Sequence, residues 1–375
     1  MKIAVAPSSF KGSLSALRVA LIIKDAINSV NKNVEVIPIP VSDGGEGLVY
    51  NLELLLNVER ITTQVNNPLM HKLNADYAVL NSETAILEMA SASGLTLLNE
   101  DERNPLITTT FGTGELLKDA IKRGFKNIFI GAGGSATCDC GVGALTALGF
   151  NFSKHGKTPI YPSGQHLNEI DSLHMDDIIS NLTETKIKVL CDVTNEVSGE
   201  NGTAAVFAKQ KGATEKEINE LENNVNSFVD FTEKFLDLEN TNIQYSGAAG
   251  GLAYGLHYYA NAELISGIDF FLNLIDFKNR VKDCNLIISG EGLFDNQTLS
   301  SKAPFGVAKI AKELGIPLMI ICGDYDERAK SNFCNYFKYF LSLKSFNNNR
   351  DELISKAEHY LRSLIIDFFN DYEFN

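Results

Sequence analysis

The sequence has few cysteines, fewer positive than negative charges, and no long apolar run. Its six cysteines are scattered over 375 residues, which is not a disulfide framework and favours a reducing, cytoplasmic location. The net charge of −14 disfavours a general affinity for nucleic acid or for an anionic membrane. The apolar stretch within residues 1–10 is too short for a signal peptide, and no run is long enough to span a membrane.

Several catalytic signatures are also missing. Gly156-Lys157-Thr158 is similar to the end of a Walker A sequence, but Asn151 stands where the first glycine is required. The sequence contains no HRD or DFG set, no HExxH and no G-x-S-x-G. A P-loop NTPase, a protein kinase fold, a zinc protease and an α/β-hydrolase elbow are therefore disfavoured.

The bulk composition and the hydrophobic patterns indicate an α/β protein of roughly two domains. Short apolar runs alternate with helical patterns up to about residue 57 and again from about residue 283. Short strands separated by turn residues fill residues 60–89 and predict an antiparallel segment. Ser13 is predicted to cap the first helix, and Thr214 with Glu217 to form a capping box.

Residues 285–314 are the richest stretch for chemistry. A buried strand is predicted at residues 286–288, and a helix begins just after Pro304. The loop predicted between them contains Gly290, Glu291, Gly292, Asp295, Gln297, Thr298, Ser300, Ser301 and Lys302. Its acids suit Mg²⁺ and its lysine suits phosphate oxygens. An ordinary strand-to-helix loop, capped by Ser300 or Ser301 and with an Asx turn at Asp295, is the open alternative.

Six parallel strands are predicted, and all end in loops that carry glycine, acid or hydroxyl residues. They begin at Lys2, Val34, Asn127, Ile187, Leu286 and Leu318. In open α/β sheets ligands bind outside the carboxyl ends of the strands, so one common site is expected. Lys11 follows the first strand, and Asp43 and Glu46 are close enough to share a cation, unless they cap a helix. Asp192 ends an apolar strand, where a carboxylate is costly unless it is used or paired. Lys211 is a second candidate phosphate cation or a helix-face charge.

The glycine-rich segment at residues 131–143 fits G-x-G-x-x-G/A after a strand. The acidic residue expected about 20 positions later is missing, and Asn151 and Lys154 lie in that region instead, which disfavours a dinucleotide. Ser135, Thr137 and Asp139 suit a phosphate or a small polyol better. Tight packing between strand and helix is the alternative explanation for these glycines.

Eight segments taken together carry a resemblance to a known family. In chain order they are APSSFKGSLSA from Ala6, SDGGEG from Ser42, TTTFGTGEL from Thr108, GGSATCDCG from Gly133, CDV from Cys191, NGTAAVFAKQKGA from Asn201, GAAGGL from Gly247 and SGEGLFDNQTLSSKAPFGVA from Ser289. On these segments the sequence resembles the bacterial glycerate kinase family of the glycerate kinase I type. The resemblance covers nearly the whole chain, which makes it far more specific than a short motif.

The resemblance implies transfer of the ATP γ-phosphate to a hydroxyl of D-glycerate with Mg²⁺, and favours 2-phosphoglycerate over 3-phosphoglycerate. It implies a Rossmann- or flavodoxin-like parallel-sheet domain split in sequence, and the changes of pattern near Asn57 and Asp283 predict its bounds as residues 1–57 plus 283–375. A mixed α/β domain, residues 58–282, is inserted into it, with the active site in the cleft between them. The expected partners are ATP and D-glycerate, with no nucleic acid and no membrane, and the expected assembly is a monomer or a homodimer.

These inferences assign a role to each candidate residue. Lys11 and Lys302 are predicted to neutralise phosphate or the glycerate carboxylate, and Asp192 to orient or deprotonate the acceptor hydroxyl. The predicted metal ligands are Glu46, Glu291 and Asp295. The residues predicted to bind substrate or phosphate are Ser9, Asp43, Gly133, Gly134, Ser135, Thr137, Lys211, Gly290, Gly292 and Thr298, with backbone N–H groups of residues 133–137 and 290–292 cradling anionic oxygens.

The sequence also departs from the family pattern. Asp is usual where Ser8 stands, and Arg-Ile-Asp-Gly is usual at residues 293–296, which read Leu-Phe-Asp-Asn here. Asn and Gly are usual at Cys138 and Cys140, and Asn-Pro-Leu at residues 195–197, which read Asn-Glu-Val. A catalytically impaired family member is therefore an alternative, beside a nicotinamide-dependent hydroxy-acid oxidoreductase and a non-catalytic sensor.

Overall fold

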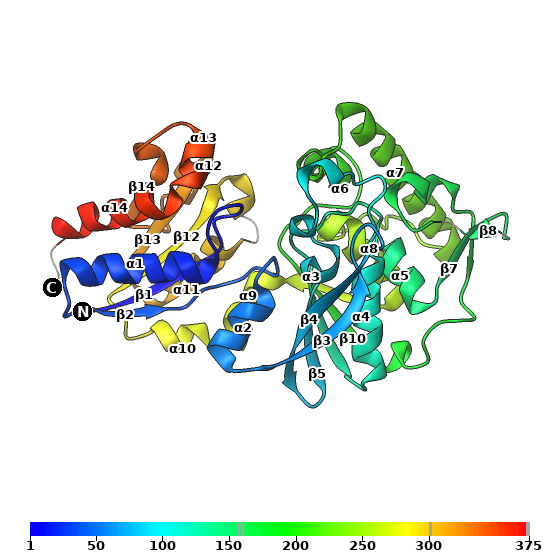
Figure 1. Cartoon of the computed structure of the whole chain (residues 1–375), viewed down its shortest axis with the longest axis horizontal. Helices are drawn as coiled ribbons and strands as arrows, with labels where there is room; N and C mark the ends of the chain where they lie inside the picture. Colours follow the sequence, from blue (N-terminus) through cyan, green and yellow to red (C-terminus); the bar gives the residue numbers. More distant parts are fainter. Residues whose placement is uncertain (157, 160, 300–301, 373–375) are drawn as a thin grey trace. The chain divides into compact units, whose positions relative to one another are not determined.

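The computed structural model describes residues 1–156, 158–159, 161–299 and 302–372. The chain forms two compact units, which we call the split unit (Met1–Asp43 and Ile268–Asn375) and the inserted unit (Gly44–Gly267). Figure 1 shows both, with labels on those elements that leave room for one. These bounds differ from the predicted 1–57 plus 283–375 and 58–282, because hydrophobic patterns mark where element types change and not where packing contacts change.

The split unit is built on a parallel sheet with the strand order β14-β13-β12-β1-β2. Its strands are β1 (Lys2–Pro7), β2 (Glu35–Pro38), β12 (Leu286–Phe294), β13 (Leu318–Tyr325) and β14 (Tyr339–Ser342). Numbered along the chain, this is the flavodoxin-like order 2-1-3-4-5, which confirms the predicted fold class. The order reverses between β1 and β12, and ligands of such sheets bind outside the carboxyl ends of the strands at this switch point.

Helices cover both faces of this sheet. They are α1 (Ala16–Val30), α9 (Gly267–Leu274), α10 (Phe277–Val281), α11 (Ala303–Leu314), α12 (Glu327–Phe333), α13 (Arg350–Ser355) and α14 (Ala357–Asn370), with short 3₁₀ turns at Asn296–Leu299 and Leu343–Ser345. α1 and α14 lie side by side on one face (Figure 1). There they bury Ile23, Leu361 and Ile365 against Ile3 and Val5 of β1, since a parallel sheet needs cover on both faces.

The first helix begins two residues later than its predicted cap implies. Ser15 is the N-cap of α1, and its side chain accepts a hydrogen bond from the Arg18 N–H at 3.2 Å. The predicted cap at Ser13 is wrong, because residues 10–14 fold back as a tight turn before the helix starts. The Ser13 hydroxyl donates instead to the Ile354 carbonyl oxygen at 3.1 Å.

The inserted unit contains a six-stranded mixed sheet with the order β11-β10-β6-β5-β4-β3. Its strands are β3 (Glu59–Asn66), β4 (Lys72–Asn81), β5 (Thr84–Glu88), β6 (Asn127–Gly131), β10 (Lys186–Cys191) and β11 (Glu263–Ser266). β3, β4 and β5 pair antiparallel, which confirms the predicted antiparallel segment, and the other pairings are parallel. A small antiparallel sheet is formed by β7 (Asn151–Lys154), β8 (Thr158–Pro159) and β9 (Ser172–His174).

The helices of the inserted unit are α2 (Leu48–Leu56), α3 (Ala90–Ser93), α4 (Phe111–Lys122), α5 (Val142–Leu148), α6 (Thr203–Phe207), α7 (Glu215–Leu236) and α8 (Leu252–Ala260). Short 3₁₀ turns lie at Leu95–Leu97, Glu100–Glu102, Gly164–Glu169, Leu182–Glu184, Lys209–Lys211 and Ala248–Gly251. The predicted capping box of Thr214 and Glu217 starts α7. In the part of the chain described, no helix combines the length and apolar character needed to cross a membrane.

Candidate active site

In the split unit, the carboxyl end of β12 lies between two neighbouring strands. β12 pairs with β1 as far as Gly290, and it runs on to Phe294 because its pairing with β13 continues to that residue. The prediction that residues 290–292 form a loop is therefore wrong, because these residues belong to β12. Gly290 is needed there because a Cβ would lie 1.9 Å from the Ile321 carbonyl oxygen. The Gly290 carbonyl oxygen accepts from the Ser8 N–H at 2.9 Å, so this group is used within the split unit, while a role of Gly292 in an anion cradle stays a prediction.

Four side chains gather at this strand end, and we call them the switch-point cluster: Glu291, Asp295, Thr298 and Lys302. Glu291 is 8% exposed, and its Oε1 accepts a hydrogen bond from Thr298 Oγ1 at 2.5 Å. Lys302 Nζ lies 3.6 Å from Glu291 Oε2 and donates to Asp295 Oδ1 at 3.0 Å. All four were predicted as site residues from the sequence, and the structure places them together.

The switch-point cluster places one lysine beside two carboxylates, and the side chains of Lys302 and Glu291 are nearly buried. Burial raises the pKa of Glu291 to about 7, against the opposing effect of the Lys302 charge. Burial lowers the pKa of Lys302, but the carboxylates of Glu291 and Asp295 outweigh it and the net pKa is raised. Asp43 adds a negative charge near both groups. The lysine therefore remains a cation at neutral pH, as neutralising a phosphate oxygen requires.

Lys302 is also the N-cap of α11, and Pro304 lies in its first turn. Ser300 and Ser301, the capping residues of the alternative interpretation, lie outside the described residues, as does Lys157. The Asx turn that the alternative interpretation predicted at Asp295 is present. Asp295 Oδ1 accepts a hydrogen bond from the Gln297 N–H at 3.0 Å. Asp295 thus shapes the chain before α11 and contacts Lys302 at the same time.

The loop after β1 folds back as a tight turn. Phe10 N–H donates to the Leu14 carbonyl oxygen at 2.8 Å, and Leu14 N–H returns a bond to Phe10 at 3.0 Å. Lys11 lies at the exposed tip of this turn, and its backbone packs on β12, where a Cβ at Gly292 would lie 3.2 Å from Lys11 N. Ser9, half-buried, precedes the turn. Lys11 and Ser9 therefore lie at the same sheet edge as the switch-point cluster.

In the inserted unit, a glycine loop covers the carboxyl ends of β6 and β10. Gly44 has a φ of +99°, and a Cβ there would lie 2.6 Å from the Leu190 carbonyl oxygen. A Cβ at Gly133 would lie 2.4 Å from Gly45 Cα and 3.0 Å from Asp192 Oδ2. Gly133 N–H donates to the Gly44 carbonyl oxygen at 3.2 Å. The two predicted glycine loops therefore touch, and the Asp192 carboxylate lies beside them.

The backbone of residues 133–137 is partly bonded within the inserted unit. The Gly133 N–H is used as described above, and the Ala136 N–H donates to the Ser93 carbonyl oxygen at 3.0 Å. These two groups are not available to an anion, contrary to the prediction. Within the described ranges, no acceptor is found for the N–H groups of Gly134, Ser135 and Thr137.

Lys211 lies beneath this loop and is 3% exposed. Its Nζ donates to Ser135 Oγ at 2.8 Å and to the Thr137 carbonyl oxygen at 2.7 Å. Burial lowers the pKa of Lys211, and nearby acidic groups, Asp139 and Asp192 among them, act in the opposite direction. Lys211 therefore fixes the loop through these two hydrogen bonds, and its role as a phosphate cation stays a prediction.

Asp139 is an internal anchor of the same loop. It is 0% exposed, and its carboxylate accepts from Thr110 N–H at 2.7 Å, Thr110 Oγ1 at 2.8 Å, and the N–H groups of Gly141 and Gly143 at 3.2 Å each. Burial raises the pKa of Asp139, and these hydrogen bonds act against that rise. The suggestion that Asp139 suits a phosphate or a polyol is wrong, because protein donors enclose the carboxylate.

Glu88 is a buried carboxylate that sequence reasoning missed. It ends β5, and it accepts from Gly47 N–H at Oε1 (2.9 Å) and from Val49 N–H at Oε2 (3.2 Å). Glu88 thus binds the first N–H groups of α2, the role that the alternative interpretation gave to Asp43 and Glu46. The one available signal was a carboxylate at the end of an apolar strand, the same signal that selected Asp192.

The predicted metal ligands belong to different units. Glu291 and Asp295 lie in the split unit, and Glu46 lies exposed in the inserted unit. Across the described ranges, no group of three or more His, Cys, Asp or Glu side chains is arranged to hold a metal ion. Mg²⁺ that arrives with a nucleotide needs only one or two protein carboxylates, because phosphate and water complete its shell. Glu291 and Asp295, with Asp43 nearby, fit that kind of site.

The departures from the family pattern lie in different surroundings. Ser8 donates from its N–H and its Oγ to the Gly290 carbonyl oxygen, at 2.9 and 3.2 Å, and Leu293 is 45% exposed. Ser8 and Leu293 both lie at the sheet edge of the switch-point cluster, so these two departures change the candidate site. Cys138 and Cys140 are fully buried in the core of the inserted unit, so these two departures are changes in packing.

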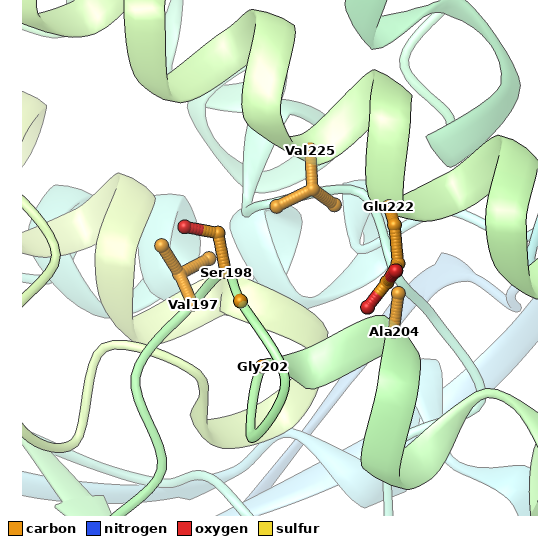
Figure 2. A pocket seen from close by; sticks show the side chains of 7 residues that line it. Val197, Ser198, Gly202, Ala204, Glu222 and Val225 are labelled. Atoms are coloured by element: carbon orange, nitrogen blue, oxygen red, sulfur yellow. The ribbon is translucent and has the colours of Figure 1, made fainter.

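A small pocket in the inserted unit lies between α7 and the segment before α6 (Figure 2). Its empty volume is about 150 Å³, the part open to solvent included, and it is lined by Val197, Ser198, Gly199, Gly202, Ala204, Glu222 and Val225. Figure 2 shows Glu222 and Val225 projecting from the helix toward Ser198 and Ala204. Pockets for small molecules usually measure about 300–1,000 Å³, and none of these lining residues was predicted as a site residue.

Each unit carries lysine and carboxylate side chains at the carboxyl ends of parallel strands. Together the fold and these clusters define an open α/β protein, a class whose ligands bind outside the carboxyl ends of the strands. The sequence matches the model of the Glycerate kinase family over residues 3–372, and the chain therefore belongs to the glycerate kinase family. This match confirms the resemblance and the expected class of ATP-dependent phosphotransferases.

Individual relatives agree with this assignment. The chain is 43% identical over 324 residues to a glycerate kinase of Bacillus subtilis (strain 168), covering 86% of this chain and 85% of that one. It is 38% identical over 324 residues to a glycerate 2-kinase of Escherichia coli (strain K12), with the same coverage. A crystal structure described as a candidate glycerate kinase 2 from Salmonella typhimurium LT2 matches with a TM-score of 0.76 and 32% identity, covering 98% of this chain and 97% of that one.

Proposed function

We propose that this protein transfers the γ-phosphate of ATP to the 2-hydroxyl of D-glycerate and releases 2-phosphoglycerate and ADP; transfer to the 3-hydroxyl is the less favoured outcome. The match to the Bacillus subtilis glycerate kinase over 86% of the chain carries the proposal. The name of the Escherichia coli relative, a glycerate 2-kinase, supports the choice of hydroxyl.

Phosphoryl transfer depends mainly on positioning and on neutralising phosphate charge. In the split unit, Lys302 is the nearly buried cation for a phosphate oxygen, with Lys11 at the tip of the neighbouring turn. Glu291 and Asp295 would hold Mg²⁺, which when bound supplies further positive charge to the nucleotide phosphates.

In the inserted unit, Asp192 is the proposed group that orients or deprotonates the acceptor hydroxyl. Gly134, Ser135 and Thr137 offer backbone N–H groups beside it, and Lys211 adds positive charge from below. The proposal requires the residues of both units for one reaction. The arrangement of the two units in a cleft, and the state as monomer or homodimer, stay predictions. The six free cysteines suit the proposed cytoplasmic location.

The experiment that tests the proposal measures ADP release from Mg-ATP with and without D-glycerate. We expect release that depends on D-glycerate and stops when EDTA removes Mg²⁺. Glycerate-independent release at the same rate would show an ATPase and contradict the proposal, as would an equal rate with a hydroxy acid of different length.

A catalytically impaired family member is the second candidate, and Ser8 and Leu293 favour it because both replace charged residues usual in the family. If this candidate is correct, the wild type turns over slowly and the double variant Ser8→Asp, Leu293→Arg is faster. The family assignment favours phosphoryl transfer over nicotinamide-dependent oxidation, and an absence of NAD(P)H absorbance change with glycerate would dispose of the latter.

A further inference from the structure

Glu88 directs a buried carboxylate at the start of α2. The side chain is at the end of β5 and the residue is 7% exposed. Its two oxygens accept hydrogen bonds from Gly47 N–H at 2.9 Å and Val49 N–H at 3.2 Å. The first N–H groups of a helix have no partner within the helix, so an acceptor from another element must satisfy them where water is excluded. Glu88 supplies that acceptor from a neighbouring strand.

Glu88 holds the loop of residues 44–47, which has few side-chain atoms of its own. Three of its four residues are glycines, and Gly47 has a φ of +89° and makes no side-chain cap for α2. Such a loop is fixed by backbone hydrogen bonds, because glycine offers no side chain to pack and costs the most entropy to order. The two bonds to Glu88 hold its carboxyl-terminal end.

The other end of this loop touches the candidate site. Gly44 accepts from the Gly133 N–H at 3.2 Å, and a Cβ at Gly133 would lie only 2.4 Å from Gly45 Cα. The same Cβ would lie 3.0 Å from Asp192 Oδ2, so loop, strand end and carboxylate are in close packing. Close-packed backbone transmits a displacement to its neighbours, and a shift of about 1 Å near reacting groups can cost about a hundredfold in rate.

We propose that Glu88 is a positioning residue for the reaction: its carboxylate fixes the loop of residues 44–47 and thereby the place of Gly133 and Asp192, without touching a substrate. The kinetic part of this proposal rests on the proposed function. The competing interpretation is a helix cap that contributes to stability alone. A cap of that kind changes the unfolding temperature but leaves turnover unchanged when the assay is run well below it.

The first test compares steady-state kinetics of Glu88→Ala, Glu88→Gln and Glu83→Gln. Glu83 precedes the same strand at its other end, where its exposed carboxylate pairs with Lys126 at 2.6 Å, which makes it a matched control. We expect Glu88→Ala to lower kcat by about 10- to 100-fold while KM for ATP changes by less than about threefold. Glu88→Gln keeps an acceptor oxygen for one N–H group and should recover part of kcat, and Glu83→Gln should match the wild type.

The second test measures amide hydrogen exchange of residues 44–50 and does not depend on activity. We expect exchange there at least about tenfold faster in Glu88→Ala, with unchanged exchange in β6 and β10. Wild-type exchange in this segment, or kcat within twofold of the wild type in a folded Glu88→Ala, would overturn the proposal. If Glu88→Ala does not fold, Glu88→Gln is judged by the same two criteria. If the wild type transfers no phosphate, the proposed function fails, and exchange alone decides whether Glu88 holds the loop.

Discussion

Replacing Lys302 by methionine removes the cation of the switch-point cluster and keeps most of the side-chain length. Lys302 Nζ lies 3.0 Å from Asp295 Oδ1 and 3.6 Å from Glu291 Oε2, and the side chain is 13% exposed, so solvent screens its charge only weakly. Removing one partner of a buried ion pair costs about 3–5 kcal/mol when the other stays charged. Glu291 can avoid part of this cost by binding a proton, since its pKa is already about 7. We therefore expect a stability loss of about 1–3 kcal/mol at pH 7.

The expected loss of activity is larger than stability explains. If Lys302 neutralises phosphate charge in the transition state, Lys302→Met lowers kcat by about a hundredfold or more, equivalent to about 2.7 kcal/mol. Lys302→Arg keeps the charge with a different geometry and should recover part of kcat. Lys309→Met on the same helix removes an exposed ion pair with Asp269 at 2.8 Å and should keep kcat within about twofold.

The assay is ADP release at saturating Mg-ATP and D-glycerate, at a temperature well below the unfolding transition of each variant. Circular dichroism supplies the unfolding transitions, so that a loss of folded protein is not counted as a loss of turnover. A Lys302→Met variant with near wild-type kcat would refute the role given to this lysine. An equal loss of kcat in Lys302→Met and Lys309→Met would refute it too, because the effect would then belong to the helix and not to the charge.

Two further variants and one control test the packing and the charge of the site. Gly133→Ala should lower kcat at least about tenfold, because the new Cβ meets backbone at 2.4 Å. Gly315→Ala, which strains a helix end with a φ of +67° and open space around it, should cost about 1 kcal/mol of stability with kcat unchanged. Glu291 has a folded pKa of about 7 against an ordinary 4.5, so the folded state binds its proton more tightly and this group's contribution to stability falls as pH rises between these values. Glu291→Gln should remove that fall, at most about 1.4 kcal/mol per pH unit, and a pH-independent difference from the wild type in urea unfolding would contradict the assignment.

The parallel α/β architecture was readable from the sequence because buried strands and amphipathic helices leave periodic hydrophobic patterns. The carboxyl end of β12 could not be predicted from the sequence, because residues 289–294 contain glycine and glutamate and lack an apolar run. Residues 289 and 290 pair with both β1 and β13, and the pairing with β13 alone extends the strand to residue 294. The cap of α1 was misplaced for a related reason, because Ser13 and Ser15 have the same chemistry and only the turn at residues 10–14 decides between them.

The candidate residues were easier to find than their roles. A lysine and acids within twelve residues, as in the switch-point cluster, are visible along the sequence. Asp139 was also identified from the sequence as a candidate. Its donors at Thr110 lie about 30 residues away in the chain, so the sequence could not predict that protein donors surround its carboxylate. Glu88 has its partners 39 and 41 residues away and stands in no motif. Long-range hydrogen bonds of this kind depend on the folded sheet.

The most direct test of the account is the identity of the phosphorylated product. Purified protein is incubated with Mg-ATP and D-glycerate in the presence of enolase, with phosphoglycerate mutase left out. The account predicts immediate formation of phosphoenolpyruvate at the rate of ADP release, because 2-phosphoglycerate is the substrate of enolase. Phosphoenolpyruvate that forms only after mutase is added, or ADP release without any phosphorylated glycerate, would contradict it.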